Sequence, residues 1–317
     1  MDRIDRMKLF ARIVECGSFA QAAQELGVAR SSATDAVKQL ERETGTLLLV
    51  RTTRHVGATV EGEAFFRRAR AILDDVEDAF ESFRGAPPSG QLRIEAVGQL
   101  TRSFLVPRLP DFLARYPEIS VRFGQSDHFV DLVRDGVDCA LRSGTSDDSS
   151  LTMRHLADLP EVTCASPAYL AAHGMPQGID ALAGHQMVGF VSSRTGEVIP
   201  LEFRRDGRLE TRALPSRVET DNSDTAAELA LNGLGLIQAP RYRFAPHLAA
   251  GKLVEVLPET PPDPIPLNAI YAGSRRTSRR LDVFLDWAQV VFDAEFRGVG
   301  VPSQHLMERI EDEPAPV

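Results

Sequence analysis

The chain has 317 residues, of which 43% are hydrophobic and 26% charged, an ordinary composition for a soluble protein of more than one domain. Its cysteines (Cys16, Cys139 and Cys164) are few, odd in number and widely separated, which argues against a disulfide scaffold. The N-terminus lacks the apolar core of a signal peptide, and no apolar run approaches the length of a membrane span. We therefore expect a cytoplasmic protein.

The net charge of −9 is unevenly distributed along the chain. Residues 1–70 carry 12 basic and 9 acidic side chains, a balance of +3, which leaves −12 for the remainder. A modestly basic head on an acidic body suits a protein that binds DNA through one end only.

The first 45 residues predict three short helices. An apolar stripe runs from Met7 to Val14, and Ser18 followed by Gln21 forms a capping box that starts the second helix. Gly27 interrupts the pattern, and residues 31–43 form the third helix. This arrangement is the helix-turn-helix plan, in which the third helix enters the DNA major groove.

A short apolar run at residues 47–49 and a basic stretch at residues 51–55 follow the third helix. We interpret them as a wing that contacts the DNA backbone or minor groove. The alternative is a solvated basic loop.

A long helix is predicted from Thr59, which can cap it, to a hinge at residues 85–90. Apolar residues recur along it at steps of three and four, as in a coiled coil. Because a monomer would leave this seam in water, we interpret it as a dimer interface; the alternative is a helix packed on its own domain. The seam consists of Phe66, Ala69, Leu73, Val76, Phe80 and Phe83.

From Leu92 onward the pattern predicts alternating strands and helices, and hence a parallel sheet with right-handed crossovers. The first group comprises strands at 92–97, 119–124 and 137–141, with helices at 101–116 and 129–134. A second group comprises strands at 162–165, 187–191, 217–220 and 234–238, a hairpin of 201–204 with 210–214 around Asp206-Gly207, and helices at 167–173, 223–231 and 242–250. A strand at 267–271 and a helix at 278–294 return to the first group, and we expect disorder from residue 298.

The N-terminal sequence resembles the LysR-type transcriptional regulators. The resemblance is carried by Phe10, Val14-Glu15, Gly17-Ser18-Phe19, Ala22-Ala23, Leu26, Leu40-Glu41, Gly45, Leu48-Leu49, Arg51, Thr53-Arg54, Thr59 and Gly62. The rest of the chain also fits the family's ligand-sensing half. Within the family, residues 131–138 and 162–170 resemble a large subgroup whose effectors are mostly unassigned.

The resemblance implies an α/β protein with a winged helix-turn-helix head, a long coiled-coil dimerisation helix and a two-lobed effector domain like a periplasmic binding protein. We expect the head at 1–58, the linker helix and hinge at 59–90 and the effector domain at 91–297. Within the effector domain, lobe I takes residues 91–161 and 267–297, and lobe II takes 162–266.

The resemblance also suggests which side chains read DNA. Ala29 stands where the family has a small capping hydroxyl, and the loss of that cap costs about 1 kcal/mol. Asp35 stands where the family has a basic or amide residue; it could accept a hydrogen bond from a cytosine amino group, or pair with Arg30 or Lys38. For Ser18 and Gln21, which lie at the start of the second helix, the alternative is that they only cap this helix. The candidate DNA contacts are Ser18, Gln21, Arg30, Ser31, Thr34, Asp35, Lys38, Arg51, Thr53 and Arg54.

A small-molecule effector is expected between the lobes, beyond the carboxyl ends of the strands. The N–H groups at the start of the helix at 223–231 could hold a carboxylate there. Any one of the candidates could instead be a plain turn or cap residue. They are Gly98, Gln99, Leu100, Thr101, Ser103, Arg142, Ser143, Phe190, Ser192, Asp221, Asn222 and Gln238.

Enzymatic function is not expected. The sequence lacks a Gly-x-Ser-x-Gly elbow, a P-loop and a His-Glu-x-x-His motif, and its seven histidines do not pair at metal-ligand spacing. Cys139 and Cys164 fall in predicted strands, where core packing is favoured over a redox pair. We expect no cofactor and no metal.

The predicted function is sequence-specific DNA binding to an interrupted palindromic operator by a homodimer or homotetramer, under effector control. One alternative is a small-molecule binding protein whose N-terminal helices only oligomerise. Another is an α/β enzyme with an appended helical domain.

Overall fold

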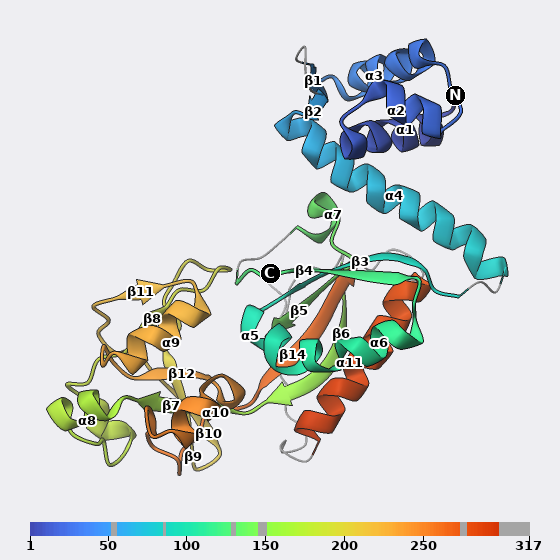
Figure 1. Cartoon of the computed structure of the whole chain (residues 1–317). Helices are drawn as coiled ribbons and strands as arrows, with labels where there is room; N and C mark the ends of the chain where they lie inside the picture. Colours follow the sequence, from blue (N-terminus) through green and yellow to red (C-terminus); the bar gives the residue numbers. More distant parts are fainter. Residues whose placement is uncertain (52–55, 85–86, 128–130, 145–150, 273–277, 298–317) are drawn as a thin grey trace, which may run out of the picture.

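The computed structural model describes residues 1–51, 56–84, 87–127, 131–144, 151–272 and 278–297. Figure 1 shows a helical head, one long helix beneath it and two α/β lobes below. Within these ranges, no helix is both long and apolar enough to cross a membrane. The C-terminal residues from 298, which we expected to be disordered, lie outside the described residues.

The head is a winged helix-turn-helix, as predicted. It consists of α1 (Arg3–Cys16), α2 (Phe19–Glu25), α3 (Arg30–Thr44) and the antiparallel strands β1 (Leu49–Arg51) and β2 (Val56–Ala58). The apolar faces of the three helices meet in one buried core, which includes Phe10, Ala22, Val37 and Leu40. Burial of these faces fixes the helices against one another.

Two of the helix N-caps that the sequence predicted, at Ser18 and Thr59, are formed. Ser18 Oγ accepts the backbone N–H of Gln21 at 3.3 Å, but the Gln21 amide donates to Glu25 rather than completing the capping box. Ala29 provides no side-chain cap for α3, as expected. Thr59 Oγ1 accepts the N–H of Gly62 at 2.8 Å at the start of the long helix, as predicted.

The long helix α4 (Val60–Arg84) corrects one premise of the sequence analysis. Phe66 packs against the head core, and Ala69 and Leu73 are buried within the single chain, where α4 runs between α1 and the first lobe (Figure 1). A monomer therefore does not leave this half of the seam in water. Phe80, further along, is 65% exposed, and the side chain of Phe83 is outside the described residues.

The first lobe is built on a five-stranded mixed sheet rather than the expected parallel one. Its order is β4 (Ile119–Gly124), β3 (Gly90–Ala96), β5 (Cys139–Ser143), β14 (Ile265–Ala272) and β6 (Leu151–Leu159). The first three strands are parallel, but β14 runs antiparallel to both β5 and β6. The edge strand β6 was not predicted. The mixed sheet allows β14 to return from the second lobe into the middle of the first.

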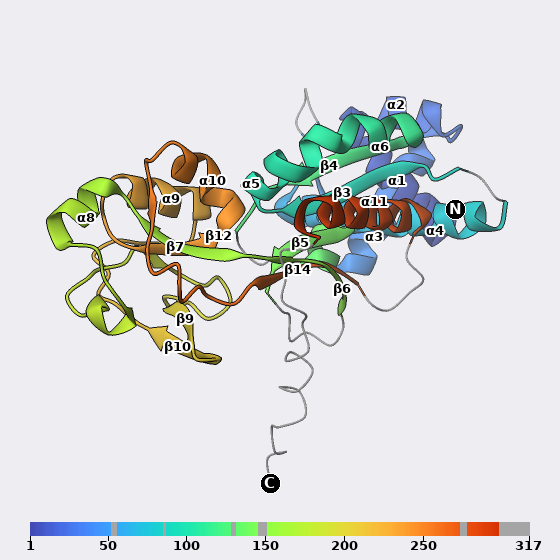
Figure 2. The ribbon, with the colours of Figure 1, turned by 90° about the horizontal axis from the view of Figure 1, so that it is seen from below.

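Helices cover both faces of this sheet. On one face, α11 (Arg279–Phe296) and α6 (Leu109–Arg115) lie against each other (Figure 2), with Phe112 packed on Trp287 at 4.9 Å between ring centroids. On the other face lies α7 (Leu132–Asp135), next to α4. Cys139 lies in the larger core, where burial raises the pKa of its thiol, as expected for a packing cysteine.

The helix expected over 101–116 is broken into three pieces, which are a π turn (Thr101–Leu105), a 3₁₀ turn (Val106–Arg108) and α6. A short helix, α5 (Gly98–Leu100), precedes them. Proline lacks a backbone N–H and restricts the residue before it, so Pro107 and Pro110 account for the interruptions.

The second lobe contains three small sheets and three α-helices. The antiparallel order β12-β7-β13 is central, β8 and β11 pair in parallel, and β9 and β10 form the predicted hairpin, in which Asp206 and Gly207 both have positive φ. Several expected strands are shorter than predicted. The elements are β7 (Glu161–Ala165), α8 (Pro167–His173), β8 (Gly189–Phe190), β9 (Leu201–Arg205), β10 (Arg208–Arg212), β11 (Glu219–Thr220), α9 (Ser223–Leu231), β12 (Ile237–Pro240), α10 (Arg241–Ala249) and β13 (Val254–Glu255).

The chain crosses between the lobes twice, at Pro160 between β6 and β7 and again before β14 (Figure 2). The first lobe also contacts the long helix α4, through α7. There, Gly136 has φ +64°, and a Cβ at this position would lie 3.0 Å from the carbonyl oxygen of Arg67. The long helix is thus pressed closely against the first lobe.

Candidate nucleic-acid interface and inter-lobe site

The third helix presents one buried and one exposed face. Ala33, Ala36, Val37 and Leu40 are buried in the head, which leaves the opposite side of α3 facing solvent. The predicted contact residues on α3 lie on this outer side. Arg30, Ser31, Asp35 and Lys38 are exposed, and Thr34 is half-buried. An amphipathic helix of this kind has the form needed to enter a major groove.

The other predicted DNA contacts are less informative. Ser18 is half-buried and its oxygen caps α2, which favours the capping alternative, whereas Gln21 is exposed and bonded to Glu25. Thr53, Arg54 and the side chain of Arg51 lie outside the described residues.

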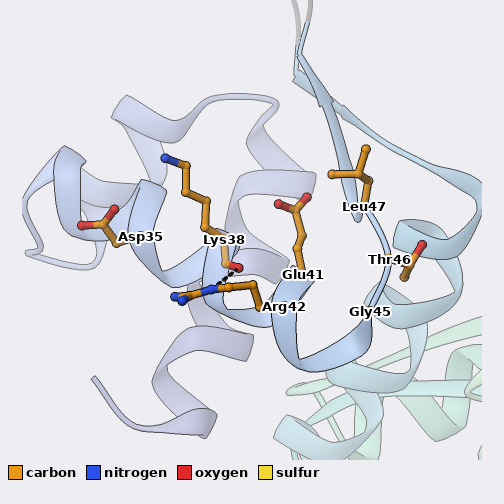
Figure 3. Close-up of a pocket in the computed structure, with 7 residues that line it drawn as sticks. All are labelled: Asp35, Lys38, Glu41, Arg42, Gly45, Thr46 and Leu47. Atoms are coloured by element: carbon orange, nitrogen blue, oxygen red, sulfur yellow. Dashed lines mark hydrogen bonds between the residues drawn. The ribbon is translucent and has the colours of Figure 1, made fainter.

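A groove of about 770 Å³ lies between α3 and the wing (Figure 3). Lys38 and Glu41 project from α3 on the same side, and Leu47, just before β1, faces Glu41. The groove is lined by Asp35, Lys38, Glu41, Arg42, Gly45, Thr46 and Leu47.

The charges in this groove have different partners. Glu41 Oε1 accepts the backbone N–H groups of Leu48 and Leu49, at 3.0 and 3.3 Å, and so ties the wing to α3. Lys38 and Arg42 are both exposed and follow one another at helical spacing. Asp35, in contrast, is exposed in the groove, where its charge would repel an incoming phosphate. Sequence reasoning missed Arg42, although its position four residues after Lys38 was a usable signal.

Several predicted effector residues lie inside a lobe instead of between the lobes. Leu100 and Thr101 are buried in the first lobe, where Thr101 Oγ1 donates to the Val97 carbonyl at 3.1 Å. In the second lobe, the Gln238 amide bonds to Thr163 and to both backbone groups of Glu202. These three side chains have structural roles that the sequence did not reveal.

Five other candidates also have local surroundings. Phe190 packs on a second-lobe core cluster, and Ser192 Oγ accepts the backbone N–H groups of Arg194 and Thr195 in a turn. Ser103 is exposed in the middle of the π turn, Ser143 is exposed at the end of β5, and Asp221 is exposed in the loop before α9.

The remaining candidates meet at the facing edges of the two lobes. Gln99 Nε2 donates to the Arg243 carbonyl at 3.0 Å, and Asn222 Nδ2 donates to Asp127 Oδ2 at 3.1 Å. At Gly98 the space is tight, since a Cβ there would lie 2.9 Å from Gln125 Oε1. The sequence therefore identified two side chains that bridge the lobes.

Two half-buried side chains of opposite charge, Arg142 and Glu95, lie at the first-lobe edge. Arg142 donates to the Ser126 carbonyl at 2.5 Å and faces Glu95, whose Oε1 would be only 1.6 Å from a Cβ at Gly124. Burial raises the pKa of Glu95 and lowers the pKa of Arg142, and the charge of each partner opposes the shift in the other. The hydrogen bond from Arg142 ties β5 to the loop that carries Asp127.

Asp127, on the loop after β4, was missed by sequence reasoning, which in the first lobe considered only the loops after the first and third strands. Its carboxylate receives hydrogen bonds from Asn222 and Ser223 of the second lobe. Arg102 was also missed, and it forms an ion pair with Asp224 across the same gap at 3.1 Å. Neither residue has a sequence signal, because each acts through a partner more than 90 positions away.

Two family models match the chain. Residues 4–63 match the bacterial regulatory helix-turn-helix protein of the lysR family, and residues 85–293 match the LysR substrate binding domain. A helix-turn-helix transcriptional repressor of Pseudomonas aeruginosa is 34% identical over 92% of this chain and 93% of its own length.

The transcriptional regulator CrgA of Neisseria meningitidis serogroup C is 35% identical over 89% of this chain and 95% of its own length. A solved structure of CrgA, a LysR-type transcriptional regulator, superposes with a TM-score of 0.57 at 33% identity, covering 92% of this chain and 99% of that one.

Proposed function

The chain belongs to the LysR family of DNA-binding transcriptional regulators, and from this premise we propose that the exposed side of α3 reads the operator. The observation that carries the proposal is the outward placement of Arg30, Ser31 and Lys38 beside a groove bounded by the wing. Side chains at the start of this helix can reach base edges, while Lys38 and Arg42 along the groove can contact phosphates. The remaining contacts named from the sequence belong to the same proposal.

The test is binding of the purified chain to its own upstream DNA across a salt series. Lys38→Ala should weaken binding and lower the slope of log K against log salt by about 1, because one phosphate contact is lost. Arg208→Ala is the matched control, since it removes an exposed cation from the β10 strand of the second lobe. An unchanged slope in Lys38→Ala, or no preference for that DNA over random sequence, would contradict the proposal.

We also propose that the second half of α4 forms a dimer contact. Phe80 is a large apolar side chain left 65% exposed on a helix whose earlier seam residues are buried within the chain. Phe80→Glu should shift the sedimentation equilibrium toward monomer, because a charge cannot be buried cheaply in an apolar seam. Val60→Glu, at an 83% exposed position that starts the same helix, is the control. Equal dimer dissociation constants for the two variants would exclude α4 as the contact.

The regulatory half of the proposal is that a small-molecule effector binds between the two lobes and alters the placement of the heads. The expected division at residues 1–58, 59–90 and 91–297 belongs to it, with a homodimer or homotetramer on an interrupted palindrome. The inter-lobe hydrogen bonds from Gln99 and Asn222 support a site at this edge. An effector changes transcription only through a difference in its affinity for two arrangements of the lobes.

A further inference from the structure

The Asp127 carboxylate of the first lobe lies at the N-terminus of α9 in the second lobe. Ser223 N–H donates to Oδ2 at 2.9 Å, Asn222 Nδ2 donates to the same oxygen at 3.1 Å, and Ser223 Oγ donates to Oδ1 at 3.0 Å. Both oxygens are therefore bound by the second lobe. The backbone carbonyl of Asp127 is also engaged, since Ser193 Oγ donates to it at 3.2 Å.

Helix α9 is built to receive a negative charge at this end. Its first backbone N–H groups point out of the helix, and the helix dipole makes this end partly positive. Asn222 caps the helix by accepting the N–H of Thr225 through Oδ1, so its amide nitrogen is turned toward Asp127. The chain thus supplies the anion for this helix from its other lobe.

Two further contacts cross the gap beside Asp127. Arg102 of the first lobe pairs with Asp224, and Asp224 is held by Arg243, which is only 5% exposed. Phe104 of the first lobe packs edge-on against Tyr242 of the second at 5.1 Å between ring centroids. These contacts keep the two lobes in the relative position that places Asp127 at the start of α9.

We propose that Asp127 is an internal ligand that latches the two lobes together, and that its release from the start of α9 lets the lobes separate. This inference rests on the proposed regulatory function and adds how the inter-lobe site is controlled. A small molecule bearing a carboxylate would compete with Asp127 for the same donors. The closed arrangement is then the resting state of the chain rather than a product of effector binding.

The test is a chemical rescue on the purified full-length chain without DNA. Asp127→Ala removes the carboxylate, and hydrogen exchange at the N–H of Ser223 should become roughly tenfold faster, because a charge-assisted hydrogen bond is lost. The radius of gyration from small-angle scattering should rise. Acetate or formate, at the same ionic strength as a chloride control, should restore slow exchange in a saturable way.

Glu228→Ala is the matched control, because Glu228 is exposed on the same helix and its loss changes the charge equally. Asp127→Asn preserves the shape of the side chain and serves if the alanine variant does not fold. It should show faster exchange without acetate rescue, since the amide still occupies the site. Wild-type exchange and dimensions in both Asp127 variants would overturn the latch.

DNA binding is measured separately on the same variants. If the chain binds no operator but Asp127→Ala opens and is rescued, the proposed regulatory function fails and the latch stands. If the operator is bound but acetate leaves Asp127→Ala unchanged, the latch fails and the regulator stands. The two proposals are therefore distinguishable.

Discussion

The contact between α1 and α4 and the contact between the two lobes join parts of one chain by different means. In the first, Phe10 packs edge-on against Phe65 at 5.3 Å, and Leu73 is buried. In the second, most of the described cross-lobe contacts are polar, with Asp127 bound to Asn222 and Ser223. Apolar contacts stabilise over a broad area and have no alternative partner, whereas water or a ligand can replace each hydrogen bond. From this difference we expect the head to stay fixed to its helix and the two lobes to be able to change their relative position.

The largest effect is expected when the aromatic pair between α1 and α4 is removed, which tests whether apolar packing holds the head to α4. Phe10 is fully buried, and Phe10→Ala should cost about 3–5 kcal/mol of head stability by leaving a cavity. Thermal unfolding followed by circular dichroism measures the loss. Phe80→Ala, at a 65% exposed position, should change monomer stability by less than about 0.5 kcal/mol. Similar losses in the two variants would mean that this contact does not hold the head.

The second prediction concerns pH at the crossing between the lobes. Burial, with a smaller effect from the Glu202 charge, raises the pKa of Glu161 to about 8. The folded chain therefore binds this proton more tightly than the unfolded chain does. The contribution of the protonated Glu161 carboxyl to the stability of the fold is complete below the ordinary pKa near 4.5, and it is lost as the pH rises to about 8.

Glu161→Gln should therefore remove this fall and raise the unfolding temperature at pH 8 relative to wild type. The free energy of unfolding at pH 8 should increase by about 2 kcal/mol. This is less than the full pKa shift of Glu161 implies, because the side chain keeps some solvent contact. Unfolding temperatures recorded from pH 5 to 8 measure it, with Glu228→Gln as the exposed control. A parallel pH profile in wild type and Glu161→Gln would exclude the carboxyl as the cause.

The third prediction tests how closely α4 packs against the first lobe. Gly136 and Gly251 have nearly equal positive φ angles, +64° and +65°, but only Gly136 has neighbours where a Cβ would stand. Both alanine variants should lose about 1 kcal/mol from backbone strain, and Gly136→Ala should lose about 1 kcal/mol more because Arg67 must move. Denaturant unfolding of both variants measures the difference. Equal losses would show that α4 does not press on the first lobe in solution.

The smallest expected effect tests whether an ion pair contributes to the contact between α1 and α4. Lys8 Nζ lies 3.4 Å from Glu77 Oε1, and their side chains are 41% and 62% exposed. A double-mutant cycle with Lys8→Ala and Glu77→Ala should give a coupling of less than about 0.5 kcal/mol, because exposed ion pairs contribute little. A coupling above about 1 kcal/mol would mean that the ion pair, rather than apolar packing, joins α1 to α4.

The features that the sequence predicted well depend on neighbouring residues. Ser18 and Thr59 cap helices through donors three residues away, and Asp206-Gly207 form a turn whose positive φ angles suit these two residues. The three helices of the head were readable because each has one apolar face. The α/β class of the body followed from alternating patterns in the same way.

The features that were missed depend on distant residues. Strand β6 carries Arg154, His155 and Asp158, so its sequence lacks a clear apolar alternation, and its place beside β14 is set more than 100 positions away. The burial of Leu73 within the chain also had no signal, because a seam that faces α1 and one that faces a partner helix read alike. Asp127 is one acid in a loop, and only the folded chain shows that α9 receives it.

The unbroken course of α4 has a consequence for the angular setting of the head. The helix contains 25 residues, and its contacts with α1, which run from Phe65 to Glu77, overlap its contact with the first lobe at Arg67. The head and the first lobe therefore hold different sides of the same turns of α4. Each residue adds about 100° of rotation, so one residue inserted between Phe65 and Glu77 would turn these sides out of alignment by about 100°, and four inserted residues by about 40°. Residues added after Glu77 would leave the angle between head and lobe unchanged, so this stretch of α4, and not its total length, acts as a phase setting.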